Sequence, residues 1–214
     1  MNKDKKEITS ALTHLAGAIF GVIGLFILLN VAIKQRSLIS IVAFFIFGLS
    51  MILLYSSSFA YHLIDKSKKK AKDIMRKVDH IMIFVLIAGT YTPFCLLVLD
   101  KSIGYKMLAI VWSITIIGAF IKIFWINAPR WVSAGLYLGM GWLSVIIIKP
   151  MTYSLPTSGI FYLVLGGILY TVGGVIYGLK KPNINLSWFG FHELFHLFVL
   201  AGTFSHFLVM KTII

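Results

Sequence analysis

The chain has 214 residues, of which 59% are hydrophobic and 13% are charged, with twenty Lys and Arg against seven Asp and Glu. A soluble domain usually carries about a quarter charged residues, so this composition excludes a secreted globular enzyme, a coiled coil and a disordered chain. The basic residues lie between long apolar runs and not on one face, which argues against nucleic-acid binding. A single cysteine, Cys95, excludes an intramolecular disulfide framework. The sequence predicts an integral membrane protein.

Seven stretches are apolar enough and long enough to cross a lipid bilayer as helices, which takes about 20 residues each. The alternating apolar and polar strands of about ten residues that mark a membrane β-barrel are not found. We therefore expect an all-α protein, a bundle of seven transmembrane helices in one domain over 11–214, after a tail over 1–10 and with a basic loop over 64–78. The expected spans, in chain order, cover 11–33, 38–63, 80–99, 103–125, 131–148, 159–179 and 189–210.

Basic residues in the connections set the expected orientation, because Lys and Arg collect on the cytoplasmic side of a membrane protein. The side without the N-terminus carries six, which are Lys34, Arg36, Lys101, Lys106, Lys149 and Lys211. The side with the N-terminus carries fourteen, which are Lys3, Lys5, Lys6, the seven between Lys66 and Lys77, Lys122, Arg130, Lys180 and Lys181. The N-terminus is therefore expected in the cytoplasm and the C-terminus outside.

Small residues and a proline predict how the spans pack. The spacings Gly17-x-x-x-Gly21 and Gly135-x-x-x-Gly139 would let helices approach closely, and we expect both to pack within the bundle. Pro93 lies inside the third expected span and is expected to kink it, because proline cannot donate the helical hydrogen bond.

Ionisable groups inside membrane spans are costly, so they are candidate functional residues. Five of the seven carboxylates fall in the tail or the connections, and only Asp79 and Glu193 lie at the mouth of a span. Among the six histidines, His62 ends the second span, and His192 and His196 begin the seventh. The alternating direction of the spans brings these ends to one membrane face, so the five side chains are expected in one layer.

The spacing of these residues favours a metal site. His192 and His196 are four residues apart, which puts both imidazoles on one helical face. With His62 they would supply three neutral nitrogen ligands and leave a fourth position open, the pattern of a catalytic zinc site. Asp79 is the expected general base for water at that position, and Ser58, one turn before His62, is expected to orient water or polarise a substrate carbonyl. A proton or ion pathway is the alternative use of such a cluster.

The segment from His192 to His196 reads H-E-L-F-H, which matches the zinc metalloprotease signature. The match alone does not predict a protease, because the usual setting of that signature is a soluble domain. Glu193 is a second candidate for the group that activates water, and it could equally face the lipid headgroups. Asp79 is preferred because a helix dipole stabilises a carboxylate at the start of a span.

The other three histidines are weaker candidates. His206 lies ten residues beyond His196, or about 15 Å along a helix, so it is expected at the membrane interface and not at the metal. His14 either supports the metal ligands or lies at the interface. His80 is adjacent to Asp79 in sequence and is expected to point away from the face of that residue.

Three separated motifs resemble the progestin and adipoQ receptor superfamily: Ser58-Phe59-Ala60-Tyr61-His62, then Asp79 seventeen residues later, then His192-x-x-x-His196. Within it, the stretches SSSFAYH, VDH and HELFHLF are similar to the bacterial haemolysin III branch. The resemblance covers nearly the whole chain. It implies a seven-helix bundle with a cytoplasmic N-terminus, and zinc near the inner leaflet held by His62, His192 and His196, with Asp79 and Ser58 close to the water.

The resemblance also implies functions. In the adiponectin-receptor branch it implies amide hydrolysis of ceramide-like lipids, and in the bacterial branch it implies membrane-lipid homeostasis, with the haemolysin name reflecting an older cytolytic assignment. We therefore expect a multi-pass protein of the bacterial plasma membrane that binds Zn²⁺ and hydrolyses lipid amides or esters, with membrane lipids as partners and no nucleic acid. A non-catalytic sensor or regulator with structural zinc, and a pore-forming cytolysin, are the alternatives.

Overall fold

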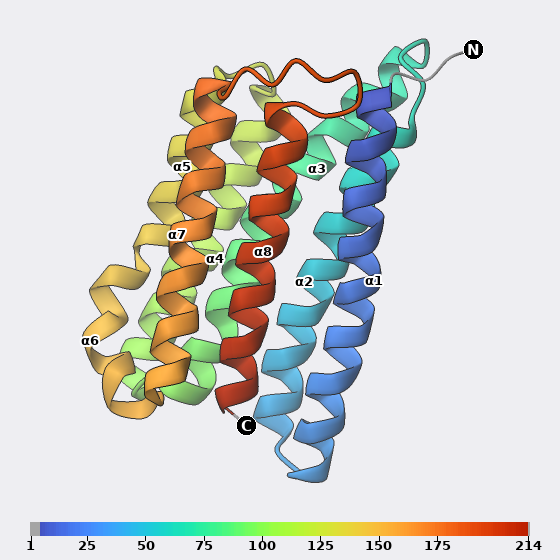
Figure 1. Ribbon diagram of the computed structural model, residues 1–214. Coiled ribbons are helices and arrows are strands. Elements are labelled where there is room, and N and C mark those ends of the chain that lie inside the picture. The colour runs from blue at the N-terminus through green and yellow to red at the C-terminus, as the bar shows by residue number, and fades with distance from the viewer. Residues whose placement is uncertain (1–4, 214) are drawn as a thin grey trace.

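Each of the seven apolar stretches is helical in the computed structural model, which describes residues 5–213 (Figure 1). No strand occurs within these residues, so the expected all-α fold is confirmed. Two of the seven spans are made of two pieces each, α3 with the π-helical turn η1, and α5 with α6. The elements are α1 (Lys5–Lys34), α2 (Leu38–Leu63), α3 (Lys69–Pro93), η1 (Phe94–Val98), α4 (Lys101–Phe124), α5 (Arg130–Trp142), α6 (Ser144–Ser154), α7 (Thr157–Leu179) and α8 (Phe191–Ile213).

Two helices begin well before their apolar stretch. Helix α1 starts at Lys5, so part of the tail expected over 1–10 is helical, whereas Lys3 and Asp4 lie outside the described residues. Helix α3 starts at Lys69, so most of the basic loop expected over 64–78 forms its first turns. Lysine is a good helix former and this segment contains no glycine or proline, so its charges mark the edge of the apolar layer without ending the helix.

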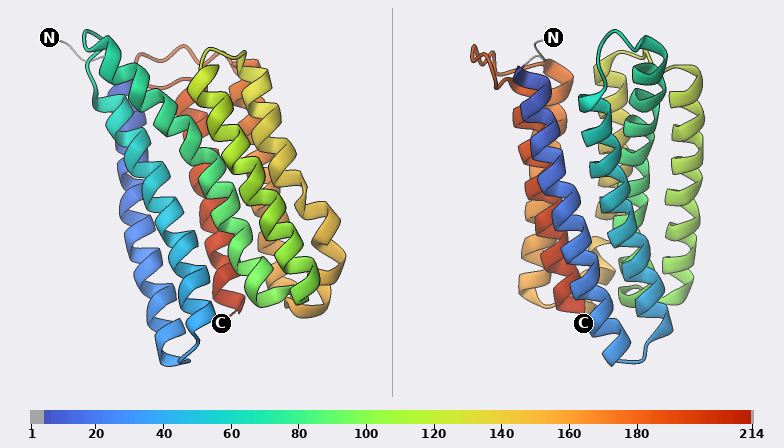
Figure 2. Two further views of the ribbon diagram at one scale, coloured as in Figure 1. Left: turned by 180° about the vertical axis from the view of Figure 1, so that it is seen from behind. Right: turned by 90° about the vertical axis from the view of Figure 1, so that its right-hand side faces the viewer.

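The helices follow one another around the bundle, and the first span lies beside the last (Figure 2). Helix α1 packs against both α2 and α8, α2 packs on α3, α3 on α4 and α5, and α7 packs on α5 and α8. Phe44, Phe47, Tyr55 and Phe84 are among the buried side chains of the core. Because α1 lies between α2 and α8, residues from both ends of the sequence meet at one end of the bundle.

The two glycine spacings behave differently. A Cβ atom added to Gly17 would lie 2.7 Å from the ring of Tyr55, and one added to Gly21 would lie 3.2 Å from Ile52, so this spacing permits the close approach of α1 and α2. A Cβ atom at Gly135 or Gly139 would meet nothing within 4 Å. The expectation that the second pair packs within the bundle is therefore wrong, because α5 turns that face toward open space.

The third and fifth spans both change course. At Pro93 the chain passes from α-helix to the π-helical turn η1, so the expected distortion takes the form of a change in helix type. The fifth span breaks at Leu143, between α5 and α6, which the sequence did not predict. Tyr91 of α3 satisfies the carbonyls freed by this break: its hydroxyl donates to the carbonyls of Met140 and Gly141 at 3.0 and 2.7 Å.

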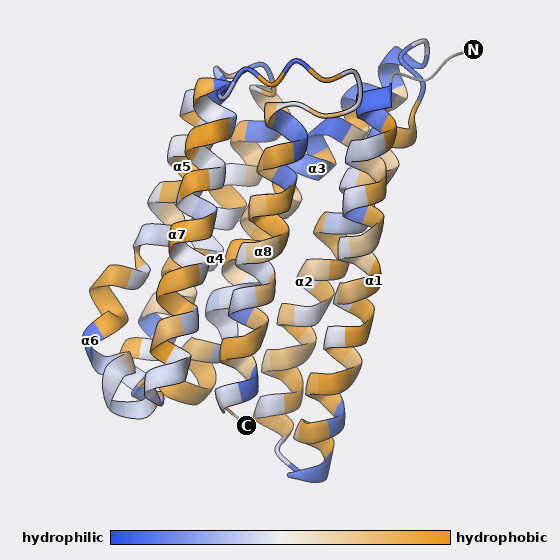
Figure 3. Cartoon of the chain, viewed as in Figure 1, coloured by the Kyte–Doolittle hydropathy of each residue, from blue (hydrophilic) through white to orange (hydrophobic). Residues whose placement is uncertain are grey.

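Hydrophilic residues gather at the end of the bundle where α1 and α3 begin and where the connection from α7 to α8 runs (Figure 3). We call this the basic end, after Lys66, Lys69, Lys70, Arg76 and Arg130. Over the middle of the bundle large apolar side chains point outward, as Phe26 does with 70% of its surface exposed. Such a surface suits lipid and not water. The chain is a multi-pass membrane protein, and the start of α1 and the end of α8 lie at opposite ends of it (Figure 1).

Candidate metal centre

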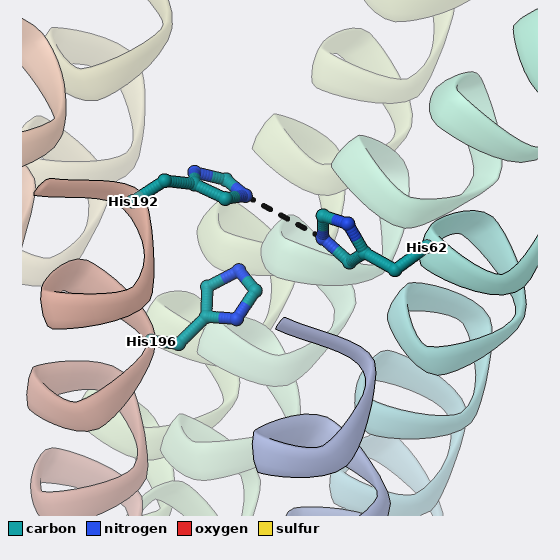
Figure 4. A group of neighbouring side chains, drawn as sticks. All are labelled: His62, His192 and His196. Carbon is teal, nitrogen blue, oxygen red and sulfur yellow. Dashed lines mark hydrogen bonds between the residues drawn. The ribbon is translucent and has the colours of Figure 1, made fainter. Parts of the chain in front are cut away.

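Three histidine side chains from α2 and α8 converge at the basic end (Figure 4). His62 lies in the last turn of α2, and His192 and His196 lie in the first two turns of α8. One ring nitrogen from each lies within 4.8 Å of those of the other two. The structure brings together the three residues that the sequence predicted as metal ligands.

The donor set fits a tetrahedral metal ion such as zinc, and one printed pair of its nitrogens has the spacing of such a site. Ligands at the usual zinc–nitrogen distance of about 2.0–2.1 Å lie roughly 3.3 Å apart around such an ion. The Nε2 atoms of His62 and His192 are 3.4 Å apart, close to that value. The group has three ligands within the described part of the chain, so a tetrahedral ion held by it keeps one position for water or substrate.

Glu7 of α1 holds the ring of His62. Its Oε2 lies 2.8 Å from Nδ1 of His62, so Nδ1 donates its proton to the carboxylate and Nε2 is left to face the other two histidines. The Nζ atom of Lys72 lies 3.4 Å from the same carboxylate oxygen and balances its charge. Glu7 is not among the predicted site residues, because it falls in the expected tail. The one signal that could have found it is an acid at the start of the first helix, on the same membrane side as His62.

Helix α1 also holds His196. Thr13 Oγ1 lies 3.2 Å from Nδ1 of His196 and donates its own proton to the backbone carbonyl of Ser10 at 2.8 Å. The ring of His14 stacks on that of His196 with centroids 3.7 Å apart. His14 is only 4% exposed, which decides between the two expectations for it: it packs against a predicted metal ligand and does not lie at the interface.

The two candidate bases have different partners. Asp79 of α3 lines the same cavity as the three histidines, together with Ser58 of α2, and its Oδ2 lies 3.6 Å from Nδ1 of His80. Glu193 is 2% exposed and is turned toward α1, where Ser10 Oγ donates to its Oε1 at 2.7 Å. Its other oxygen, Oε2, has no hydrogen-bond partner among residues 5–213. Glu193 therefore does not face the lipid headgroups.

His80 lies outside the group of three ligands. Its Nδ1 lies 3.6 Å from Oδ2 of Asp79, so the expectation that it points away from that residue is wrong. Its Nδ1 donates to the backbone carbonyl of Arg76 at 2.9 Å, and its Nε2 lies 3.5 Å from the hydroxyl of Tyr177. Both ring nitrogens are thus engaged by α3 and α7.

His206 also lies outside the group, but it is not at the interface. It is 7% exposed, its Nδ1 donates to the carbonyl of Gly202 at 2.9 Å, and its ring stacks on Tyr170. The expectation of an interfacial residue is wrong because α7 covers this ring and α8 continues for two further turns.

A cavity of about 870 Å³ extends from the three histidines into the apolar part of the bundle. Its polar end includes Ser58 and Asp79, and its deeper walls include Leu86, Ile147 and Leu163. The volume is in the range of small-molecule pockets, about 300–1,000 Å³. The cavity therefore combines a polar end at the histidines with apolar walls deeper in the bundle.

The sequence is similar to those of known proteins over almost the whole chain. The model of the family described as Haemolysin-III related matches residues 2–207. The chain is 43% identical over 203 residues to the Hemolysin-3 homolog of Bacillus subtilis (strain 168), which covers 95% of this chain and 92% of that protein. It is 40% identical over 199 residues to Hemolysin-3 of Bacillus cereus, covering 93% and 87%.

More distant similarity extends to eukaryotic receptors. The chain is 28% identical over 214 residues to the Adiponectin receptor protein of Drosophila melanogaster, which covers 91% of this chain and 48% of that protein. This likeness supports the progestin and adipoQ receptor superfamily that the motifs indicate. From the matched family model and the two Bacillus relatives, the chain belongs to the haemolysin-III related family of multi-pass bacterial membrane proteins.

Proposed function

We propose that the protein is a zinc-dependent hydrolase of lipid amides or esters that acts in membrane-lipid homeostasis. One observation carries the proposal: three histidines with room for a fourth ligand lie at the head of a cavity with apolar walls, inside a membrane-spanning bundle. Zinc bound by these neutral imidazoles supplies Lewis acidity toward water and toward a substrate carbonyl. The basic end faces the cytoplasm in this proposal, because basic residues collect there.

Residues of α1 hold the imidazoles in place for this role. Glu7 fixes His62 through Nδ1, and Thr13 fixes His196 in the same way. Each of these contacts uses one ring nitrogen and leaves the other for the metal. Such outer partners orient zinc ligands, and losing one typically weakens metal binding 10–100-fold.

Asp79 is the proposed general base. Its carboxylate takes a proton from the attacking water as the water oxygen bonds to the carbonyl carbon. It then returns the proton to the amine or alkoxide as the C–N or C–O bond breaks. Ser58, which lines the same cavity, orients the water or polarises the substrate carbonyl, and the apolar walls hold the acyl chains and exclude bulk water.

Turnover of lipids by purified protein tests the proposal. Zinc-loaded protein in neutral detergent is given a short-chain ceramide and a short-chain lysophospholipid, and released fatty acid is measured. We expect release by the wild type and a loss of at least about 100-fold in Asp79→Asn, which removes the base, at unchanged metal content. Glu193→Gln is the matched carboxylate control, and we expect it to retain activity.

Two outcomes would contradict this account. If zinc-loaded wild type releases no fatty acid from either class of lipid, hydrolysis is not the function. If Asp79→Asn keeps full activity while Glu193→Gln loses it, the base is Glu193 and the assignment of Asp79 is wrong.

A non-catalytic sensor with structural zinc is the second candidate, and one observation favours it. His14 stacks on His196, and neither of its ring nitrogens has a hydrogen-bond partner within the described chain. A movement of α1 that brings in this imidazole would close the site with a fourth nitrogen, as in structural zinc sites. Normal cell physiology in Asp79→Asn cells would support this candidate. Dye release from vesicles carrying the pure protein would instead support the cytolysis that the name of the Bacillus cereus relative indicates.

A further inference from the structure

A group of cations lies beside the three histidines, and the proposed chemistry does not use it. Arg76 of α3 and Arg130 at the start of α5 line the same cavity as the histidines. Lys122 of α4 lies behind them, fully buried. His80 links the two arginines: its Nδ1 bonds to the carbonyl of Arg76 at 2.9 Å, and its Nε2 lies 3.5 Å from the hydroxyl of Tyr177, whose ring Arg130 contacts.

The position of Arg130 is fixed by two aromatic rings. Its guanidinium carbon lies 5.5 Å from the ring centre of Tyr177 and 5.3 Å from that of Phe191. Phe191 precedes His192 in α8, so the guanidinium is held next to the proposed metal ligands. Stacking of this kind leaves the N–H groups at the edge of the guanidinium plane free to bind a ligand.

Carboxylates do not neutralise this group. Among residues 5–213, neither Arg76 nor Arg130 has a carboxylate oxygen within 4.0 Å. Arg76 donates instead to the amide oxygen of Asn127 at 3.3 Å, and buried Lys122 donates to Ser133 Oγ at 2.5 Å. Like charges gathered at the edge of a low-dielectric region are costly, so this arrangement favours a bound anion.

The lysines of the basic end provide a contrast. Lys69 and Lys70 are exposed in the first turn of α3 and lie away from the cavity, as expected of residues that only orient the protein in the membrane. Arg76 and Arg130 share the charge of those lysines and their end of the bundle. They differ because they line the cavity and because aromatic rings fix one of them.

We propose that Arg76 and Arg130 form a subsite for a phosphate group at the mouth of the cavity, so that the molecule bound there is a lipid with an anionic phosphate headgroup. Two guanidinium groups bind phosphate oxygens through paired, charge-assisted hydrogen bonds. A lipid anchored in this way has its acyl chains in the apolar cavity and its acyl linkages beside the histidines. Such a subsite defines the substrate class of the proposed hydrolase. Only the claim that the bound lipid is hydrolysed rests on the proposed function.

Direct binding to chelator-treated protein tests the subsite without any contribution from metal or turnover. Three probes are titrated in neutral detergent: dihexanoyl phosphatidic acid, dihexanoylglycerol with the same chains and no phosphate, and inorganic phosphate. We expect the wild type to bind the phosphatidic acid at least about tenfold more tightly than dihexanoylglycerol. Arg76→Gln and Arg130→Gln should each weaken binding of the phosphatidic acid about tenfold and leave dihexanoylglycerol unchanged.

Lys69→Gln is the matched control, with the same loss of charge at the same end of the bundle and outside the cavity, and it should bind as the wild type does. Arg130→Lys keeps the charge but loses the paired N–H donors of the guanidinium, so its affinity for the phosphatidic acid should lie between those of wild type and Arg130→Gln. A monodisperse elution profile and unchanged zinc uptake after reloading show that each variant is folded.

The possible results separate the two proposals. Equal binding of the phosphatidic acid by wild type, Arg76→Gln and Arg130→Gln overturns the subsite and leaves hydrolysis open. Inorganic phosphate that binds as tightly as the lipid overturns the assignment to a headgroup. Arginine-dependent lipid binding without turnover in zinc-loaded protein supports the subsite and overturns the proposed hydrolase.

Discussion

His196 and His206 lie ten residues apart on the same helix, and both are buried, yet their surroundings differ. His196 is held from α1 through its Nδ1, and its ring lies against those of His14 and His192. His206 bonds to a carbonyl of its own helix, and its ring fills the space that Gly166 leaves on α7. Burial of an imidazole therefore does not by itself indicate a metal site. A metal site is indicated where several donor groups converge and side chains of other helices orient them.

The layers around these two histidines differ in the same way. Near His206 the polar groups satisfy one another, since the hydroxyls of Tyr55 and Tyr170 lie 2.6 and 2.8 Å from that of Thr203. Near His196 they do not. Every buried side-chain nitrogen or oxygen without a hydrogen-bond partner among residues 5–213 belongs to His14 or Glu193. Native proteins rarely leave such atoms unsatisfied unless water, an ion or a ligand completes the site.

The largest difference in zinc content is expected between the alanine variants of these two histidines. His196→Ala removes one of three ligands, so metal affinity should fall by more than the roughly 100-fold that loss of an outer partner costs, and protein purified without chelator should carry almost no zinc. His206→Ala should keep the wild-type zinc content, although it is less stable. Elemental analysis per chain measures both. Equal zinc content in the two variants would contradict the conclusion that the layer at His196 binds the metal and the layer at His206 does not.

A smaller effect is expected for the carboxylate that holds His62. Glu7→Gln weakens the hydrogen bond to Nδ1 of His62, and we expect a 10–100-fold loss of zinc affinity, measured by competition with a chelator of known affinity. Asp73→Asn is the matched control, because Asp73 is an exposed acid at the same end of the bundle. A Glu7→Gln affinity within twofold of Asp73→Asn would show that Glu7 has no part in the site.

The smallest effect concerns packing alone. In Gly166→Ala the new Cβ atom would clash with the ring of His206, so the free energy of unfolding should fall by about 1–3 kcal/mol. In Gly167→Ala the new atom meets nothing within 4 Å, so stability should stay the same or rise by up to about 1 kcal/mol. Both variants should keep full zinc content. Unfolding in mixed micelles measures the stabilities, and zinc loss in Gly166→Ala would mean that the two layers are coupled.

The sequence was enough for the spans and for the three histidines. Apolar length predicts a transmembrane helix directly, and His192 and His196 are neighbours by helical spacing alone. His62 joins them because an odd and an even span meet at the same face. These inferences need only the period of a helix and the thickness of a bilayer.

The contacts from α1 could not be predicted in this way. Glu7, Thr13 and His14 reach the site because α1 packs between α2 and α8, and no periodicity specifies which helices become neighbours. The break at Leu143 and the burial of His206 depend on the same packing. The residues that surround the three histidines therefore depend on which helices pack together, and the motifs alone do not identify them.

We expect His62, His192 and His196 to bind one metal ion together. Zinc K-edge X-ray absorption of wild-type protein, purified without chelator and quantified for zinc per chain, tests it most directly. We predict one zinc per chain and a spectrum with the scattering of three imidazole rings and one further oxygen ligand. Protein without bound metal, or a zinc environment without imidazole, would contradict the account.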